Sequence, residues 1–168
     1  ELAERITALL DERKRLEREL AEARRALASG GGAASGPIAE EIARVIPVIE
    51  GMRAKTDARI SVDTRNAEVM KRAVQAGADI INDVSALMHD PRALEIVADS
   101  GLPVILMHAQ GDPRTMQDAP RYNHVLLDVF DFLEDRVEAC RRAGIAPGRL
   151  VIDPGIGFGK TIDHNLEL

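Results

Sequence analysis

The chain has 168 residues, of which 45% are hydrophobic and 30% charged, a composition typical of a globular domain. Its formal net charge of −6 leaves no basic field that would favour binding to nucleic acid or to an anionic membrane surface. No apolar run approaches the roughly 20 residues that a membrane-spanning helix requires, and the single cysteine, Cys140, excludes a disulfide within the chain. These features predict a cytoplasmic protein without a nucleic-acid or membrane partner.

The first 28 residues carry a heptad pattern. Apolar residues recur in alternating steps of four and three, with a polar interruption at Arg13, at positions Leu2, Ile6, Leu9, Leu16, Leu20, Ala23 and Leu27. Because this seam is narrow and its flanks are charged, it predicts a coiled-coil or helical-hairpin helix over residues 1–28. The alternative is a helix packed on its own chain. The run SGGGAASGP, residues 29–37, predicts a flexible linker that ends this helix.

From residue 38 to residue 168, helical and β-type patterns alternate. Strands are expected at the apolar runs 59–63, 78–84, 103–108 and 150–153, and helices at 38–55, 66–76, 91–100, 120–143 and from 161 onward. Short connections between such elements are typical of right-handed βα units on a parallel sheet. The pattern predicts an α/β fold of about four parallel βα units, with a doubly wound sheet as the generic alternative to a barrel.

Four residues suited to ligand binding stand at the C-terminal ends of the expected strands: Asp63, Asn82, Met107 and Asp153. Since these strand ends converge on one mouth in a parallel α/β sheet or barrel, we expect the four side chains to line one pocket. Two carboxylates and an amide suit the N–H and NH2 edge of a polar heterocycle, and methionine offers a soft wall for a flat ring. The alternative is that each aspartate caps the helix after its strand.

The glycine-rich segment 155–161, GIGFGKT, joins the fourth strand to a helix. It is not a Walker A motif, because Gly155 precedes Gly159 by four residues and the motif requires five. Such a turn still suits an anion held by backbone N–H groups, with Lys160 adding positive charge. The alternative is a tight loop with a surface lysine. His108 is the histidine expected near the mouth, and no cluster with metal-ligand spacing is evident.

Four strings follow one another in this part of the chain: SVDT at 61–64, IINDVS at 80–85, LMH at 106–108 and DPGIGFGKT at 153–161. In this order and spacing they resemble the motifs of dihydropteroate synthases. The resemblance covers about residues 38–168 and implies part of an eight-stranded TIM barrel. It also implies a transferase reaction of folate synthesis, in which the amine of p-aminobenzoate displaces diphosphate from hydroxymethyl-dihydropterin diphosphate.

The resemblance also implies roles for single residues. The substrate-binding set that it implies is Asp63, Asn82, Met107, Asp153, Gly157, Phe158 and Lys160. Asp63, Asn82 and Asp153 are expected to read the pterin, beside a wall formed by Met107. Phe158 and Lys160 are expected to form the loop beside the pterin and p-aminobenzoate sites. Asp63, Asp153 and Lys160 are the expected catalytic residues, since fixed carboxylates would stabilise a pterin cation as diphosphate leaves.

Against a complete family barrel, the chain supplies the third to sixth strands. The first strand, with its loop for Mg²⁺ and diphosphate, and the last strands, with a Ser-Arg-Lys-type motif, are expected to be missing. Both termini also interrupt helical patterns. We therefore expect a fragment or a fusion that is inactive alone, and the family's Mg²⁺ would lack its ligand loop here. Open sheet edges or the N-terminal helix would favour a homo-oligomer.

The N-terminal part carries a second resemblance. The string ERKRLERELAEARRALA at 12–28, followed by GGGAA, is similar to the helical segment near the C-terminal domain of alanyl-tRNA synthetases. Across residues 1–36 this similarity implies an oligomerisation helix joined to an unrelated gene. The competing functional hypothesis is therefore a coiled-coil interaction module fused to a barrel fragment without catalysis.

Overall fold

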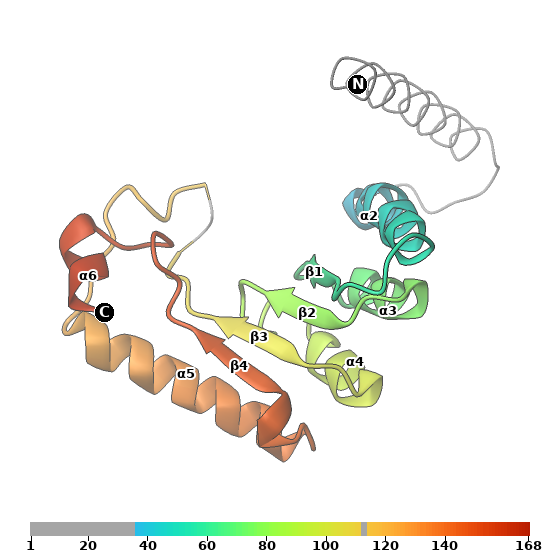
Figure 1. Cartoon of the computed structure of the whole chain (residues 1–168). Coiled ribbons are helices and arrows are strands. Elements are labelled where there is room, and N and C mark those ends of the chain that lie inside the picture. The colour runs from blue at the N-terminus through green and yellow to red at the C-terminus, as the bar shows by residue number, and fades with distance from the viewer. Residues whose placement is uncertain (1–35, 112–113) are drawn as a thin grey trace, which may run out of the picture. The chain divides into compact units, whose positions relative to one another are not determined.

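The computed structural model describes residues 36–111 and 114–168 (Figure 1). The chain divides into two units, residues 1–44 and 45–168. Of the first unit only residues 36–44 are described, and they include the start of helix α2 (Pro37–Arg53). The predicted coiled-coil helix over 1–28 and most of the predicted linker over 29–37 lie outside the described residues.

Residues 45–168 alternate strands and helices along the chain (Figure 1). The strands are β1 (Ser61–Asp63), β2 (Ile80–Asp83), β3 (Val104–Met107) and β4 (Leu150–Asp153). The helices that follow α2 are α3 (Ala67–Ala76), α4 (Ala93–Ser100), α5 (Val125–Arg142) and α6 (Ile162–Glu167), with a 3-10 turn η1 (Pro147–Arg149) before β4. Every element predicted between residues 38 and 168 is present, although several are shorter than predicted.

Helix α5 shows why one boundary differs. The pattern predicted a helix from residue 120, but α5 begins at Val125. The carboxylate of Asp128 accepts hydrogen bonds from the backbone N–H groups of Asn123 (2.9 Å) and His124 (3.3 Å), and His124 is extended, with φ −151°. An acceptor inside the first turn thus satisfies N–H groups that precede the helix, which fixes its start.

Among the described residues, four parallel strands form one sheet in the order β1-β2-β3-β4. Each strand pairs with its predecessor in the chain, and the register aligns Asp63 with Asn82 and Met107 with Asp153. A doubly wound sheet reverses its strand order at a switch point, whereas this order continues in one direction. The sheet therefore agrees with the predicted barrel segment.

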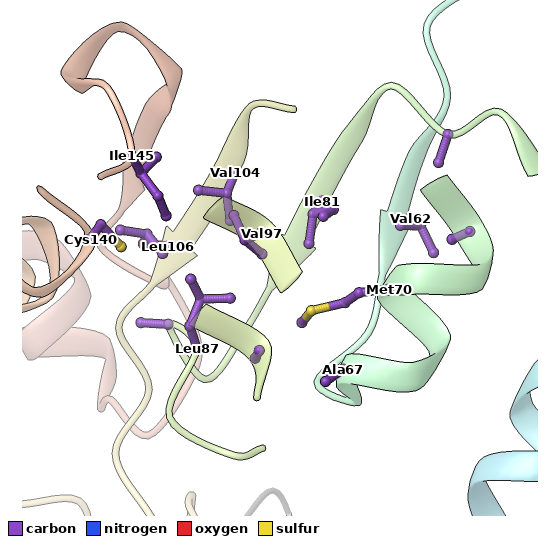
Figure 2. Close-up of a cluster of buried hydrophobic side chains, with 14 of the residues drawn as sticks. Val62, Ala67, Met70, Ile81, Leu87, Val97, Val104, Leu106, Cys140 and Ile145 are labelled. Atoms are coloured by element: carbon purple, nitrogen blue, oxygen red, sulfur yellow. The ribbon is translucent and has the colours of Figure 1, made fainter. Parts of the chain in front are cut away.

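One face of the sheet carries the core (Figure 2). Buried strand residues on this face pack against residues from the helices, and together they include Val62, Met70, Ala73, Ile81, Val97, Val104, Leu106 and Cys140. Since successive side chains of a strand point to opposite faces, the other face must carry the alternate residues. These are more exposed as a set, with Met107 as the buried exception: Ser61, Asp63, Ile80, Asn82, Ile105, Met107, Val151 and Asp153.

In the part of the chain that the structure describes, no helix combines the length and the apolar character that are needed to cross a bilayer.

The two faces should respond differently to the same substitution. Val104 is 0% exposed on the helix-covered face, and Val151 is 50% exposed on the other face. Val104→Ala should lower the free energy of unfolding by about 2 kcal/mol, because buried methyl groups are lost and a cavity remains. Val151→Ala should change it by less than about 0.5 kcal/mol. Urea unfolding followed by circular dichroism measures both, and equal losses would contradict this placement of the core.

Candidate functional site at the strand ends

The sheet register brings the four predicted strand-end residues to the same face. Asp63 aligns with Asn82, and Asn82 aligns with Ile105, which lies two residues before Met107 on β3. Met107 in turn aligns with Asp153. Because side chains two residues apart on a strand share a face, all four point to the face that lacks the helix-packed core. The roles predicted for these residues stay predictions.

Asp63 and Asn82 are joined directly. The Asn82 side-chain nitrogen, Nδ2, donates a hydrogen bond of 3.1 Å to Oδ2 of Asp63. This bond directs the amide nitrogen toward the carboxylate and leaves the Asn82 carbonyl oxygen as an acceptor for other groups. Asp63 is exposed and Asn82 half-buried, so the pair lies at the surface of the sheet.

Asp153 is oriented by the loop that it begins. Its Oδ1 accepts a hydrogen bond of 2.7 Å from the N–H of Gly155, and its backbone carbonyl accepts one of 3.0 Å from the N–H of His108. The helix caps are other residues, Asn66 for α3 and Thr161 for α6. The alternative that Asp63 and Asp153 cap the following helices is therefore wrong.

Met107 lies beneath the start of the glycine-rich loop. Its side chain is 4% exposed, and a Cβ atom placed on Gly155 would lie 3.2 Å from its Cγ. The thioether is therefore covered by the loop on one side. Met107 was predicted to form a wall for a flat ring. Only the part of its side chain that remains accessible could contact such a ring.

The glycine-rich loop, residues 154–160, packs against the backbone that follows β3. Gly155, Gly157 and Gly159 have φ values of 69°, 84° and 64°, which favour glycine. A Cβ on Gly155 would lie 2.0 Å from the His108 carbonyl oxygen, and one on Gly159 would lie 2.4 Å from the Gln110 carbonyl oxygen. Two of the three glycines are thus required by close backbone contact as well as by φ.

Lys160 is 3% exposed, so the alternative of a surface lysine is wrong. Its Nζ lies 3.0 Å from Nδ1 of His108 and donates to the carbonyl oxygens of Gly155 (2.9 Å) and Phe158 (3.2 Å). Burial lowers the pKa of Lys160 to about 8, although the nearby carboxylate of Asp153 opposes this shift. The three N–H bonds of the ammonium therefore have acceptors within the protein. The catalytic and substrate-binding roles predicted for Lys160 stay predictions.

His108 lies on the helix side of β3, opposite to Met107. It is 6% exposed, and its ring lies edge-on to Phe132, with 4.9 Å between the ring centroids. Burial, and next the positive charge of Lys160, lower the pKa of His108 to about 4. Because the Lys160 ammonium supplies the hydrogen to Nδ1, the proton of the neutral ring lies on Nε2.

Two cavities lie near the strand ends. One, of about 300 Å³, is lined by Arg65, Val84, Ser85, Met88, Ala109, Gly111, Met116, Phe132 and Phe158. The other, of about 690 Å³, is lined by His108, Gln110, Pro120, Arg121, Tyr122, Asn123, Asp128, Phe132 and His164. The smaller cavity contains one predicted binding residue, Phe158, whose side chain is 38% exposed. Neither is lined by the four strand-end residues, which lie on the open face of the sheet.

Across residues 36–111 and 114–168, no group of three or more His, Cys, Asp or Glu side chains is arranged to hold a metal ion.

A comparison with families of known proteins matches residues 26–168 to the family described as "Pterin binding enzyme". The chain belongs to this family. The matched segment contains the whole sheet and all the strings that carry the resemblance to dihydropteroate synthases.

Curated members of the family are similar to most of the chain. The dihydropteroate synthase of Escherichia coli K12 is 47% identical over 137 residues, which are 82% of this chain and 48% of the relative. That of Haemophilus influenzae is 45% identical over 144 residues, 82% of this chain and 52% of the relative. The chain thus spans about half the length of these relatives.

Solved structures of the family superpose on the sheet and its helices. Dihydropteroate synthase of Xanthomonas albilineans with 4-aminobenzoic acid is 49% identical, with a TM-score of 0.73 over 83% of this chain and 49% of that one. The same enzyme with 7,8-dihydropteroate is 44% identical, with a TM-score of 0.72 over 89% of this chain and 55% of that one. The Yersinia pestis enzyme with a sulfonamide drug is 43% identical, with a TM-score of 0.75 over 82% of this chain and 50% of that one.

Sequence reasoning missed the contact made by Tyr122, and it placed Asp83 at a strand end without predicting its role in a turn. The Tyr122 hydroxyl donates a hydrogen bond of 2.7 Å to the Gly159 carbonyl oxygen, 37 residues along the chain. The buried Asp83 carboxylate accepts from the N–H of Ser85 (2.7 Å) and of Leu87 (3.1 Å), which holds a turn in which Leu87 has a φ of 62°. An Asp two residues before Ser is a local signal for such a turn, whereas no spacing links Tyr122 to the loop.

Substitution of the loop glycines tests the close packing. Gly155→Ala and Gly159→Ala should each lower stability by at least about 2 kcal/mol, because the added Cβ meets a backbone carbonyl and φ is positive. Gly157 also has a positive φ, but an added Cβ would meet no neighbouring atom, so Gly157→Ala should lower stability by about 1 kcal/mol. Gly148→Ala, with open space and without positive φ, is the neutral control. Thermal unfolding ranks the four variants, and a different ranking would contradict the packing.

The lowered pKa of His108 predicts acid sensitivity. Between about pH 6.5 and 4 the unfolded ring binds a proton and the folded ring does not, so stability should fall by about 3 kcal/mol as the pH is lowered through this window. His108→Gln should flatten the dependence. Urea unfolding at pH 7 and pH 4.5 measures it, and the same slope in both proteins would exclude His108 as its source.

Proposed function

We propose that this chain is part of a dihydropteroate synthase and that it supplies the pterin-binding edge of the active site. The observation that carries this proposal is the shared face of Asp63, Asn82, Met107 and Asp153 at the strand ends of a chain from the pterin-binding family. The relatives crystallised with 4-aminobenzoic acid and with 7,8-dihydropteroate support the substrate class. The substrates would be hydroxymethyl-dihydropterin diphosphate and p-aminobenzoate.

In the proposed reaction the amine nitrogen of p-aminobenzoate attacks the methylene carbon beside the pterin ring. A C–N bond forms, the C–O bond to diphosphate breaks, and diphosphate leaves with the electron pair while the new ammonium loses a proton. Positive charge develops on the pterin as diphosphate departs. Carboxylates fixed before the reaction stabilise that charge without reorganising, and this is the role that we assign to Asp63 and Asp153.

Each residue of the pterin-binding edge has a separate part in recognition. Asp63 and Asp153 accept hydrogen bonds from ring N–H and NH2 groups, and the carbonyl of Asn82 is held by its bond to Asp63 as a further acceptor. Met107 provides polarizable surface for the ring. The bond from the Gly155 N–H sets the direction of the Asp153 carboxylate before any ligand binds.

The second substrate is assigned to the loop side of the site. Phe158 lines the 300 Å³ cavity together with Met88 and Met116, and an aromatic ring fits such apolar and polarizable surroundings. Gly157, the neighbour of Phe158, is exposed at the loop surface. We keep Gly157, Phe158 and Lys160 as the proposed loop residues of the site.

The remaining parts of the assembly are proposals of the same kind. The relatives are about twice as long as this chain, which supports an eight-stranded barrel in the whole protein, with these four strands as one segment. Strand β4 exposes Val151 by 50% and Ile152 by 57%. This edge would be covered by the next strand of such a barrel or, as the alternative, by a second copy of the chain, in addition to the proposed coiled coil over 1–28. The Mg²⁺ that the family resemblance implies is assigned to a ligand loop outside the described residues.

Calorimetric titration of the chain with 6-hydroxymethylpterin tests the proposal. Saturable binding is expected, and Asp153→Asn should weaken it about tenfold or more, because a charged hydrogen bond to the ring is lost. The substitution keeps a side-chain oxygen for the Gly155 N–H. Asp99→Asn, at an exposed position of α4, is the matched control and should bind as the unaltered chain does. A folded chain without pterin binding, or with equal affinity in Asp153→Asn, would contradict the proposal.

A further inference from the structure

The loop 154–160 is held at its carbonyl oxygens by side chains. The ammonium of Lys160 donates to the carbonyls of Gly155 (2.9 Å) and Phe158 (3.2 Å), one on each side of the loop tip. The same nitrogen lies 3.0 Å from Nδ1 of His108, at the end of β3. One buried side chain therefore closes the loop on itself and ties it to the neighbouring strand.

Two further donors come from the segment between β3 and α5. The Tyr122 hydroxyl donates to the carbonyl of Gly159 at 2.7 Å, and the Gln117 amide nitrogen donates to the carbonyl of Gly157. Burial raises the pKa of Tyr122, so its hydroxyl keeps its proton at neutral pH. Four of the loop carbonyls are thus bound by side chains of Lys160, Gln117 and Tyr122.

A loop of this composition needs such anchors. Its three glycines have positive φ and lose more conformational freedom on ordering than other residues do. Three of its N–H groups also have partners: that of Gly155 bonds to Asp153, that of Gly157 to Asn165 at 2.8 Å, and that of Phe158 to the Gly155 carbonyl at 3.0 Å. These bonds at both N–H and carbonyl groups restrain the loop, from which Phe158 reaches the 300 Å³ cavity.

We propose that Lys160 and Tyr122 are positioning residues, which hold the loop so that the Phe158 ring stands ready for the aromatic second substrate, and that neither touches that substrate. The inference rests on the proposed function for the identity of this substrate. It differs from a catalytic role for Lys160, because the acceptors of its ammonium are groups of the protein. It adds Tyr122, which no motif of the family resemblance contains.

Burial explains why the anchor is a lysine. At 3% exposure the ammonium has lost most of its water, and the loop carbonyls with the His108 ring replace it. Removing the ammonium leaves the carbonyl of Phe158 without this donor and the carbonyl of Gly155 with the Phe158 N–H alone, which favours an opened loop. Removing the Tyr122 hydroxyl affects a single carbonyl, so its effect should be smaller and of the same kind.

Amide hydrogen exchange of the whole ¹⁵N-labelled chain tests the positioning role. Lys160→Met and Tyr122→Phe should speed exchange at the amides of Gly155, Gly157 and Phe158 by about tenfold or more, since a lost hydrogen bond favours local opening. Exchange at the core amides of β2 and α3 should stay within about twofold. The control is Lys71→Met, at an exposed position of α3. Unchanged loop exchange, or an equal rise everywhere, would overturn the proposal, because the second result means a general loss of stability.

Titration of the same variants with two ligands tests the link to the second substrate. Affinity for 6-hydroxymethylpterin should fall much less than affinity for 4-aminobenzoate, because Asp63 and Asn82 lie outside the loop and only Asp153 is bonded to it. Affinity for 4-aminobenzoate, measured at saturating pterin, should fall by about tenfold. Equal weakening for both ligands, or no 4-aminobenzoate binding to the unaltered chain, would overturn this link. Failure of pterin binding alone would overturn the proposed function and leave the loop-exchange result to decide the positioning role.

Discussion

The alternation of side chains along four short parallel strands is the constraint on which the rest of the structure depends. Val62, Ile81 and Val104 are buried because their face of the sheet meets the helices, and residues next to them in the chain must then point the other way. With strands of three or four residues, a shift of one residue in register would exchange the two faces completely. The apolar core therefore determines which polar residues are presented at the strand ends.

The positions of the strands and of the residues at their ends were predictable because they follow from the local periodicity of apolar residues. The apolar runs located the four strands, and the residues at their ends lie on one face as expected, since parallel strands with short connections allow few other arrangements. That they line one pocket stays a prediction. The position of Asn82 beside Asp63 follows from two neighbouring strands of similar length. The strings of the family resemblance added the chemical roles, which periodicity alone cannot supply.

What could not be predicted depends on contacts between distant residues. The burial of Lys160 follows from its contact with His108, 52 residues earlier, and Tyr122 reaches Gly159 over 37 residues. A lysine after a glycine-rich turn resembles a surface residue until its acceptors are known, because lysine is rarely buried without partners. The start of α5 at Val125 was missed for a related reason, since a side chain inside the helix satisfies the N–H groups before it.

The buried amine of Lys160 also makes the loop observable by simple chemistry. A lysine whose pKa is lowered to about 8 is unprotonated in a larger fraction at mild alkaline pH than an ordinary lysine. Acylating reagents attack that unprotonated form, yet the loop covers it as long as the carbonyls of Gly155 and Phe158 stay in contact with it. The rate at which this side chain is labelled therefore cannot exceed the rate at which the loop opens. Mass spectrometry of the labelled peptide would measure that opening without a ligand and without turnover.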